Sequence, residues 1–160
     1  RNGSSSLSIY LNGTRILNTT SSVAYNNVNS NNLNVGYWRS GASPTDRFLT
    51  GYISNGRIVN GTAVYDPTLT TLTVPATPLT AIANTSLLTL QNNQSVNNNV
   101  FLDNSTNNFF LTRNGNTTQG TFSPDCANWS NYFDGTGDYL NTPSNAAFGF
   151  GTALQKQALQ

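Results

Sequence analysis

The pattern of bulky apolar and polar residues predicts its longest strand from Phe48 to Tyr65. Glycines recur there at intervals that would break a helix, whereas its β-branched and aromatic residues favour a strand. The apolar parity changes between Ile53 and Ile58, so a single strand needs one extra residue to keep both on the core face. Gly56 suits such a bulge. We therefore predict one long strand over this stretch, bulged at Gly56, with a turn at 60–61.

The remaining apolar residues form short runs between turns. Asn12-Gly13, the dipeptide most typical of a tight hairpin turn, separates two runs predicted as strands 7–11 and 14–17. Residues 66–78 contain several prolines and predict an extended connector. Only 153–160 look helical, in a short and uncapped segment. Further short strands are expected at Leu33–Trp38, Ser86–Leu90, Val100–Leu102, Asn108–Thr112, Gly120–Phe122 and Tyr139–Leu140.

Many short strands separated by asparagine-rich turns predict an all-β chain folded as an antiparallel sandwich. The 160 residues can form one such domain or parts of two. Only 8% of residues are charged and the net charge is +1, with scattered arginines, so no nucleic-acid partner is expected. No apolar run approaches the ~18 residues of a membrane helix, so no membrane insertion is expected.

The residue types that most enzymes use for acid–base chemistry are scarce. The chain has no histidine and no glutamate, and its aspartates lie apart in turn-like contexts. Glycoside hydrolysis needs two carboxyl groups at a fixed separation, one with a raised pKa. The lone cysteine, Cys126, is expected to be a small buried hydrophobe. We therefore predict a non-enzymatic protein that requires no cofactor.

Several runs of residues resemble a known domain family. YFDGTGDYLNTPSNAAFGFG (Tyr132–Gly151) resembles the opening segment of a laminin-G-like, concanavalin A-like jelly-roll domain. LSIYLNGTRI (Leu7–Ile16), LNVGYW (Leu33–Trp38) and the run Phe48–Tyr65 resemble the closing strands of the same domain type. The resemblance implies an antiparallel jelly-roll sandwich.

The order of these segments departs from the family, because the closing strands precede the opening segment and the middle of the domain is missing. Residues 1–78 resemble the C-terminal part of a domain, 79–152 the N-terminal part, and 153–160 form a short terminal helix or tail. Two explanations remain: a window across two tandem domains, or a permuted sandwich built from both halves. Either would leave Ile53, Ile58 and Phe109 partly uncovered, which predicts a homo-oligomer or a repetitive assembly.

The asparagine-rich runs LLTLQNN (87–93) and FLDNSTNNFFLTRNG (101–115) are similar to tandem laminin-G-like arrays in structural proteins of marine and cyanobacterial bacteriophages. The resemblance implies a fibre, tail or capsid-decoration protein on the virion surface, outside the cell. Its partners would be copies of itself or other virion proteins, with contact to host surface glycans as a further role. The alternative is a secreted or cell-surface carbohydrate-binding module.

Asp134 and Asp138, in the sequence DGTGD, are candidate calcium ligands, because calcium prefers carboxylate and carbonyl oxygens and glycines let the backbone turn around an ion. The alternative is that the two aspartates only stabilise the turn through backbone N–H groups.

Tyr37, Trp38, Trp129 and Tyr132 are candidate carbohydrate-binding residues. An aromatic face matches the C–H face of a pyranose, and nearby amides can bond its hydroxyls. Sandwich cores also contain Trp and Tyr, so burial of at least one of the two tryptophans is the competing expectation.

Overall fold

The computed structural model describes residues 6–20, 32–38, 47–91, 100–119, 130–148 and 155–159. Within these ranges the protein is all-β, and every strand pair is antiparallel. The strands are β1 (Ser6–Leu11), β2 (Thr14–Thr20), β3 (Asn34–Val35), β4 (Tyr37–Trp38), β5 (Arg47–Phe48), β6 (Thr50–Ile53), β7 (Gly56–Asn60), β8 (Thr85–Thr89), β9 (Phe101–Leu102), β10 (Phe110–Asn114), β11 (Thr118–Gln119), β12 (Asn131–Asp134), β13 (Tyr139–Asn141) and β14 (Gln155–Leu159). A short 3₁₀ helix, η1, spans Ala146–Phe148.

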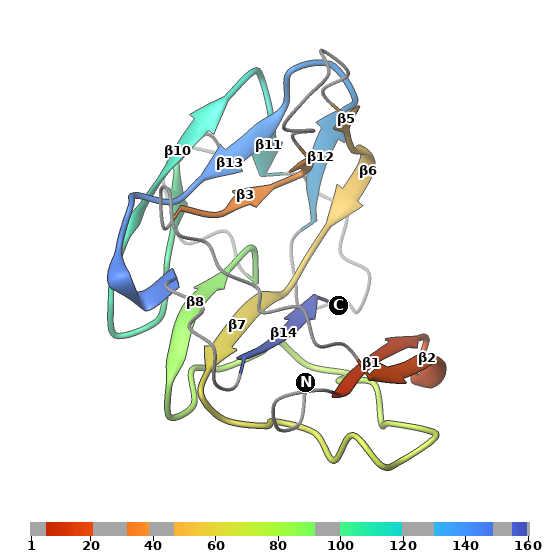
Figure 1. The fold of residues 1–160 in the computed structure, drawn as a ribbon. Coiled ribbons are helices and arrows are strands. Elements are labelled where there is room, and N and C mark those ends of the chain that lie inside the picture. The colour runs from red at the N-terminus through yellow and green to blue at the C-terminus, as the bar shows by residue number, and fades with distance from the viewer. Residues whose placement is uncertain are drawn as a thin grey trace.

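The strands form small sheets, and three of these sheets combine strands from both halves of the chain (Figure 1). One has the order β3-β13-β10-β9, a second β11-β12-β6 and a third β14-β7-β8, with two-stranded pairs β1-β2 and β4-β5. The pairs β6–β12, β3–β13 and β7–β8 each join a strand before residue 78 to a strand after residue 79. Strands from residues 1–78 therefore pair with strands from residues 79–152.

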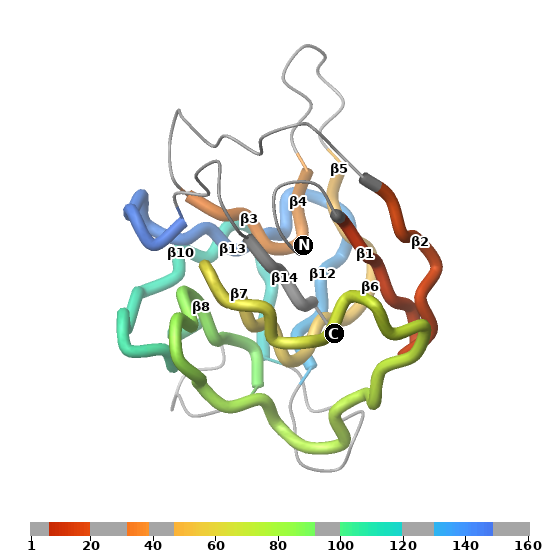
Figure 2. Tube along the Cα trace, turned by 60° about the horizontal axis from the view of Figure 1, so that its bottom comes forward, coloured from red at the N-terminus to blue at the C-terminus, as the bar shows by residue number. Residues whose placement is uncertain are grey.

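The hairpin predicted around Asn12-Gly13 is confirmed, and both residues have positive φ, 50° and 77°. It lies to one side of the other sheets, beside the connector that follows β7 (Figure 2). The Tyr10 hydroxyl donates to Leu69 O at 2.7 Å, and Arg15 N donates to Thr70 O at 2.9 Å. The predicted extended connector thus serves as a third, irregular partner of the hairpin.

The single strand predicted over 48–65 is wrong, because the chain divides it into β5, β6 and β7. The break lies at Ser54-Asn55, where Asn55 adopts φ 58°, and not at a bulge on Gly56. The register shift lies in the β7–β8 pair, between Ile58 and Val59. The strand ends at Asn60, so 62–65 are not a strand.

Gly36 divides the strand predicted over Leu33–Trp38 into β3 and β4. Its φ is +85°, and a Cβ there would lie 2.6 Å from ring carbons of Phe133. The backbone passes so closely over this buried ring that only glycine fits. The change of direction also separates Leu33 and Val35, which pack against the core, from Tyr37.

The helix predicted over 153–160 is also wrong, because Gln155–Leu159 form β14, which pairs with β7. β7 already pairs with β8 on its other side, so β14 supplies partners for its remaining N–H and C=O groups. A helix of this length gains little from propensity alone. Long-range pairing therefore overrides the local preference.

The other strands predicted between residues 86 and 140 appear close to their predicted positions, as β8, β9, β10 and β13. The strand predicted at 120–122 lies outside the described residues, as do Cys126 and Trp129.

The hydrophobic core uses residues from both halves of the chain. Its buried members are Ile58, Leu87, Leu90, Phe101, Leu111, Phe133, Leu140 and Phe148. Ile58 is only 6% exposed, so the expectation that it would be partly uncovered is wrong. Ile53 and Phe109 are partly buried and pack against this core.

Candidate functional site

A groove of about 400 Å³ opens beside β3, β4 and β5, and its lining is mostly apolar. It is formed by residues 33–38 and 47–49, with Ile53 and Ile58 at its inner side. Its volume lies within the range of ligand pockets. Among the residues that the structure describes, none that lines the groove is acidic.

Three stacked aromatic rings support one wall of the groove. Tyr37 lies directly opposite Phe48 in the β4–β5 pair, with ring centroids 5.0 Å apart, and opposite strand positions place side chains on the same face. The ring of Tyr139 from β13 stacks on Tyr37 at 4.8 Å. Such contacts hold the short strands β4 and β5 against the larger sheet.

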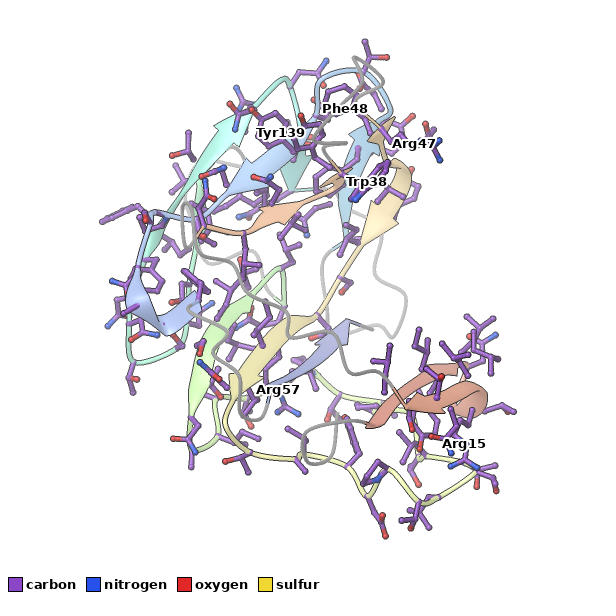
Figure 3. All side chains as sticks on the ribbon, viewed as in Figure 1. Arg15, Trp38, Arg47, Phe48, Arg57 and Tyr139 are labelled. Atoms are coloured by element: carbon purple, nitrogen blue, oxygen red, sulfur yellow. The ribbon has the colours of Figure 1, made fainter. Side chains whose placement is uncertain are left out.

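Trp38 and Arg47 form the second opposing pair of β4 and β5. The Arg47 guanidinium carbon lies 5.4 Å from the centroid of the Trp38 ring, a cation–π arrangement. Trp38 is 57% exposed. In Figure 3 the two side chains lie together near Phe48 in the upper part of the view, whereas Arg15 lies in the lower part. This tryptophan is therefore not part of the core.

One amide completes the groove. Asn34 is exposed on β3, and its Oδ1 accepts a hydrogen bond from Asn141 Nδ2 at 2.7 Å. That bond fixes the orientation of the Asn34 amide. The groove thus combines apolar surface with an exposed indole and a guanidinium.

Tyr132 lies away from the groove, paired with Tyr52 across β12 and β6 with ring centroids 5.1 Å apart. Side chains alternate between the two faces of a strand. The neighbours of these tyrosines, Ile53 and Phe133, face inward, and Ile53 lines the groove. The tyrosine pair is therefore on the outer face of this sheet. Of the four aromatic candidates the structure brings together Tyr37 and Trp38, and it separates Tyr132 from them.

The DGTGD turn is organised around the buried carboxylate of Asp138. Its Oδ1 accepts N–H bonds from Asn116 (2.7 Å) and Thr117 (3.2 Å), and its Oδ2 accepts one from Asp134 (3.0 Å). Asp134 Oδ1 accepts from Thr136 N at 2.7 Å. These bonds are those of a turn stabilised by aspartates, the alternative to calcium binding.

Two opposing effects act on Asp138. Burial raises the pKa of its carboxyl group, but hydrogen bonds from Asp134, Asn116 and Thr117 to the charged form outweigh burial and leave the pKa below its usual value. In the part of the chain that the structure describes, no cluster of three or more His, Cys, Asp or Glu side chains is present.

The sequence did not single out Arg47 and Phe48 as groove residues, nor Tyr139, which stacks on Tyr37 behind the groove. Their only signal was that Phe48 begins the predicted long strand, Arg47 precedes it, and Tyr139 begins the short strand predicted after the DGTGD turn. It also missed Asp103, a buried carboxylate that accepts hydrogen bonds from Leu88 N (2.8 Å), Ser105 N (2.9 Å) and Ser105 Oγ (2.7 Å).

No helix among the described residues is long and apolar enough to cross a membrane. Comparison with protein-family models, with curated proteins and with solved structures gives no match to this chain.

Proposed function

We propose that this protein is a non-enzymatic structural module of a virion, a fibre, tail or capsid-decoration component that assembles through its β-strands. The observation that carries the proposal is an exposed apolar face on the β1–β2 hairpin. Ile9, Leu11 and Leu17 are 42%, 59% and 41% exposed. Ile9 lies opposite Leu17, whereas Tyr10 on the other face contacts the connector. An apolar face of this kind marks an interaction surface.

We also propose a specific sandwich type for the fold and a place for the module in an assembly. The pairing of β7 with β8 and of β6 with β12 supports a permuted jelly-roll sandwich of the concanavalin A-like type. The absence of histidine and glutamate supports a structural role over catalysis. The partners would be copies of the same chain or other virion proteins on the outside of the particle.

Light scattering coupled to size exclusion at micromolar concentration tests this proposal. We expect a mass well above the 17.2 kDa of one chain, and a Leu11→Ser/Leu17→Ser variant reduced toward the monomer. Ile82→Ser is the matched control, because Ile82 is similarly exposed, at 40%, but lies outside the hairpin. A monodisperse wild-type monomer with a cooperative melt would rule out self-assembly.

A second function is supported by the groove, where Trp38 is exposed. We propose that this site binds a surface glycan, as an attachment site of the virion or of a secreted carbohydrate-binding module. A glycan array with purified protein tests it. Trp38→Ala should abolish binding, whereas Tyr132→Ala on the outer face of the β6–β12 pair should retain it. Silence of the wild-type protein on the array would leave only the structural role.

A further inference from the structure

We infer that a glycan bound in the groove continues across the neighbouring sheet face, so that the ligand is a neutral chain of several sugars. This inference rests on the glycan-binding function proposed above and names its ligand class. It depends on the register of the sheet β3-β13-β10-β9 and on the contacts that join this sheet to the groove.

The register of this sheet determines which side chains share its outer face. Asn141 lies opposite Asn34 on β3 and opposite Thr112 on β10, so these three side chains form one row on one face. The adjacent residues Leu140 and Leu111 are buried, 0% and 7% exposed, and belong to the inner face. The row is therefore on the outer face of the sheet.

The same alternation adds three more residues to the outer face. Phe110 and Asn114 flank Thr112 at a spacing of two residues on β10, and Tyr139 lies opposite Asn114. Phe110 is 77% exposed, the highest value among the large hydrophobic residues that the structure describes. We call the following six residues the amide face: Asn34, Phe110, Thr112, Asn114, Tyr139 and Asn141.

The chemistry of the amide face suits a neutral sugar chain. Amide and hydroxyl groups donate and accept hydrogen bonds, as sugar hydroxyls do, and an exposed aromatic ring packs against the C–H face of a pyranose. None of the six residues is charged. Arg113, the charged residue of β10, lies opposite the buried Leu140 on the inner face and donates to Thr117 O at 3.1 Å. The amide face therefore fits a neutral ligand better than an anion.

Two contacts join the amide face to the groove. Asn34 lines the groove, and its Oδ1 accepts the hydrogen bond from Asn141 Nδ2 at 2.7 Å. Tyr37 also lines the groove, and its ring stacks on that of Tyr139 with centroids 4.8 Å apart. Figure 3 shows Tyr139 near Phe48, another residue of the lining. The groove and the amide face thus share a border, and these contacts hold the side chains along it in place before a ligand binds.

The amide face is wider than a single sugar. Adjacent strands lie about 4.8 Å apart, so the row from Asn34 to Thr112 spans about 10 Å, and Phe110 lies about 7 Å further along β10. One pyranose ring cannot contact the groove and Phe110 at once. A chain of several sugars can contact both.

The test compares short and long neutral oligosaccharides by titration calorimetry, using the full 160-residue chain. The probes are cellobiose with cellohexaose and maltose with maltohexaose, which present β-linked and α-linked glucose. We expect the hexaose of one series to bind about ten-fold or more tightly than its disaccharide, because further hydrogen bonds and ring contacts form on the amide face. Phe110→Ala and Thr112→Val should each weaken hexaose binding at least about three-fold and leave the disaccharide affinity unchanged.

Tyr52→Ala is the matched control, because Tyr52 is also an exposed aromatic residue, at 58%, but lies in a different sheet. A melt of each variant establishes that it is folded. A hexaose affinity that neither Phe110→Ala nor Thr112→Val lowers, or that Tyr52→Ala lowers equally, would overturn the extended site and leave glycan binding in the groove standing. Wild-type protein that binds neither series would also overturn it. If the protein binds no glycan on the array either, the glycan function itself is overturned.

Discussion

At the scale of single residues, buried carboxylates stabilise turns by accepting hydrogen bonds from their backbone N–H groups. Asp138 is fully buried and collects backbone N–H groups from two separate loops. Unpaired, those N–H groups would each carry a desolvation penalty. The Asp138 carboxylate thus links the loop after β10 to the turn after β12 through hydrogen bonds.

Replacing Asp138 by Asn should destabilise the protein by about 1–3 kcal/mol, because the amide cannot accept from donors on both sides. Urea denaturation measures this change. Asp134→Asn is the control, since Asp134 Oδ1 accepts a hydrogen bond from Thr136 N in the same turn without joining a second loop. A smaller loss for Asp138→Asn than for Asp134→Asn would contradict the assignment.

The same carboxylate gives stability a defined pH dependence. Because its pKa in the folded protein lies below the usual value, its contribution is present above the unfolded pKa, about 3.9, and is lost as pH falls through the folded pKa. The free energy of unfolding of the wild-type protein should therefore decrease below about pH 5. In Asp138→Asn the free energy of unfolding should decrease less steeply at low pH. An unchanged pH dependence would show that other groups dominate the loss of stability in acid.

Calcium binding at Asp134 and Asp138 can be tested directly. Both oxygens of Asp138 already accept N–H bonds, so we expect equal melting temperatures in excess calcium and in chelator. A ligand that binds only the folded state raises the melting temperature by mass action. A melting temperature that rises in excess calcium for the wild-type protein, but not for Asp138→Asn, would establish the calcium site.

Residue-level prediction from sequence succeeded where a short motif carries its own geometry. Asn12-Gly13 predicted its turn because both residues tolerate positive φ. The groove could not be predicted in this way, since Trp38 and Arg47 meet only through the pairing of β4 with β5. Which aromatic side chains share a site is a property of register, and local sequence does not encode register.

At the scale of elements, Gly36 is the point where a predicted strand becomes two. Its positive φ permits the change of direction between β3 and β4, and its missing side chain permits contact with the Phe133 ring. Both properties are needed at one position.

Gly36→Ala should therefore be more destabilising than Gly61→Ala. Both glycines have a positive φ, +85° and +81°, and each alanine incurs a backbone cost of about 1–2 kcal/mol. At Gly61 nothing lies within 4 Å of the added Cβ, whereas at Gly36 the Phe133 ring lies at 2.6 Å. The difference in unfolding free energy between the two variants measures this overlap, and equal losses would show that Phe133 moves aside freely.

Elements were predictable to the extent that their stability is local. The hairpin and the strands around residues 86–90 and 139–140 followed from alternation and turn residues. The segment 155–159 did not, because its strand form depends on β7, nearly a hundred residues earlier in the chain. A pattern search cannot weigh a partner at that distance against a marginal helix.

At the scale of the whole molecule, the two halves of the chain share one core. Ile58 from the first half packs with Leu87, Phe133 and other residues of the second. The sequence left open whether residues 1–78 and 79–152 pair with each other.

Cleavage of the chain in the connector tests whether residues 1–78 and 79–152 belong to one domain or to two. We expect that a protease site inserted after the exposed residue Ala76, once cleaved, leaves two fragments that elute together and unfold in one transition. The reason is that β6–β12, β3–β13 and β7–β8 cross the cut. Fragments that separate without denaturant would show that the halves belong to different domains, and an uncleaved sample of the same variant is the control.

The run from Thr50 to Asn60 gives one sheet its strand β6 and another sheet its strand β7, with only Ser54-Asn55 between them. A bend this short cannot absorb a large displacement of either strand. Fluctuations that expose the amide protons of β7 to solvent must therefore disturb β6 as well, and deuterium should enter both sheets at a common rate set by global opening. The hairpin β1–β2 is outside this coupling, and its amide protons should exchange at a faster rate.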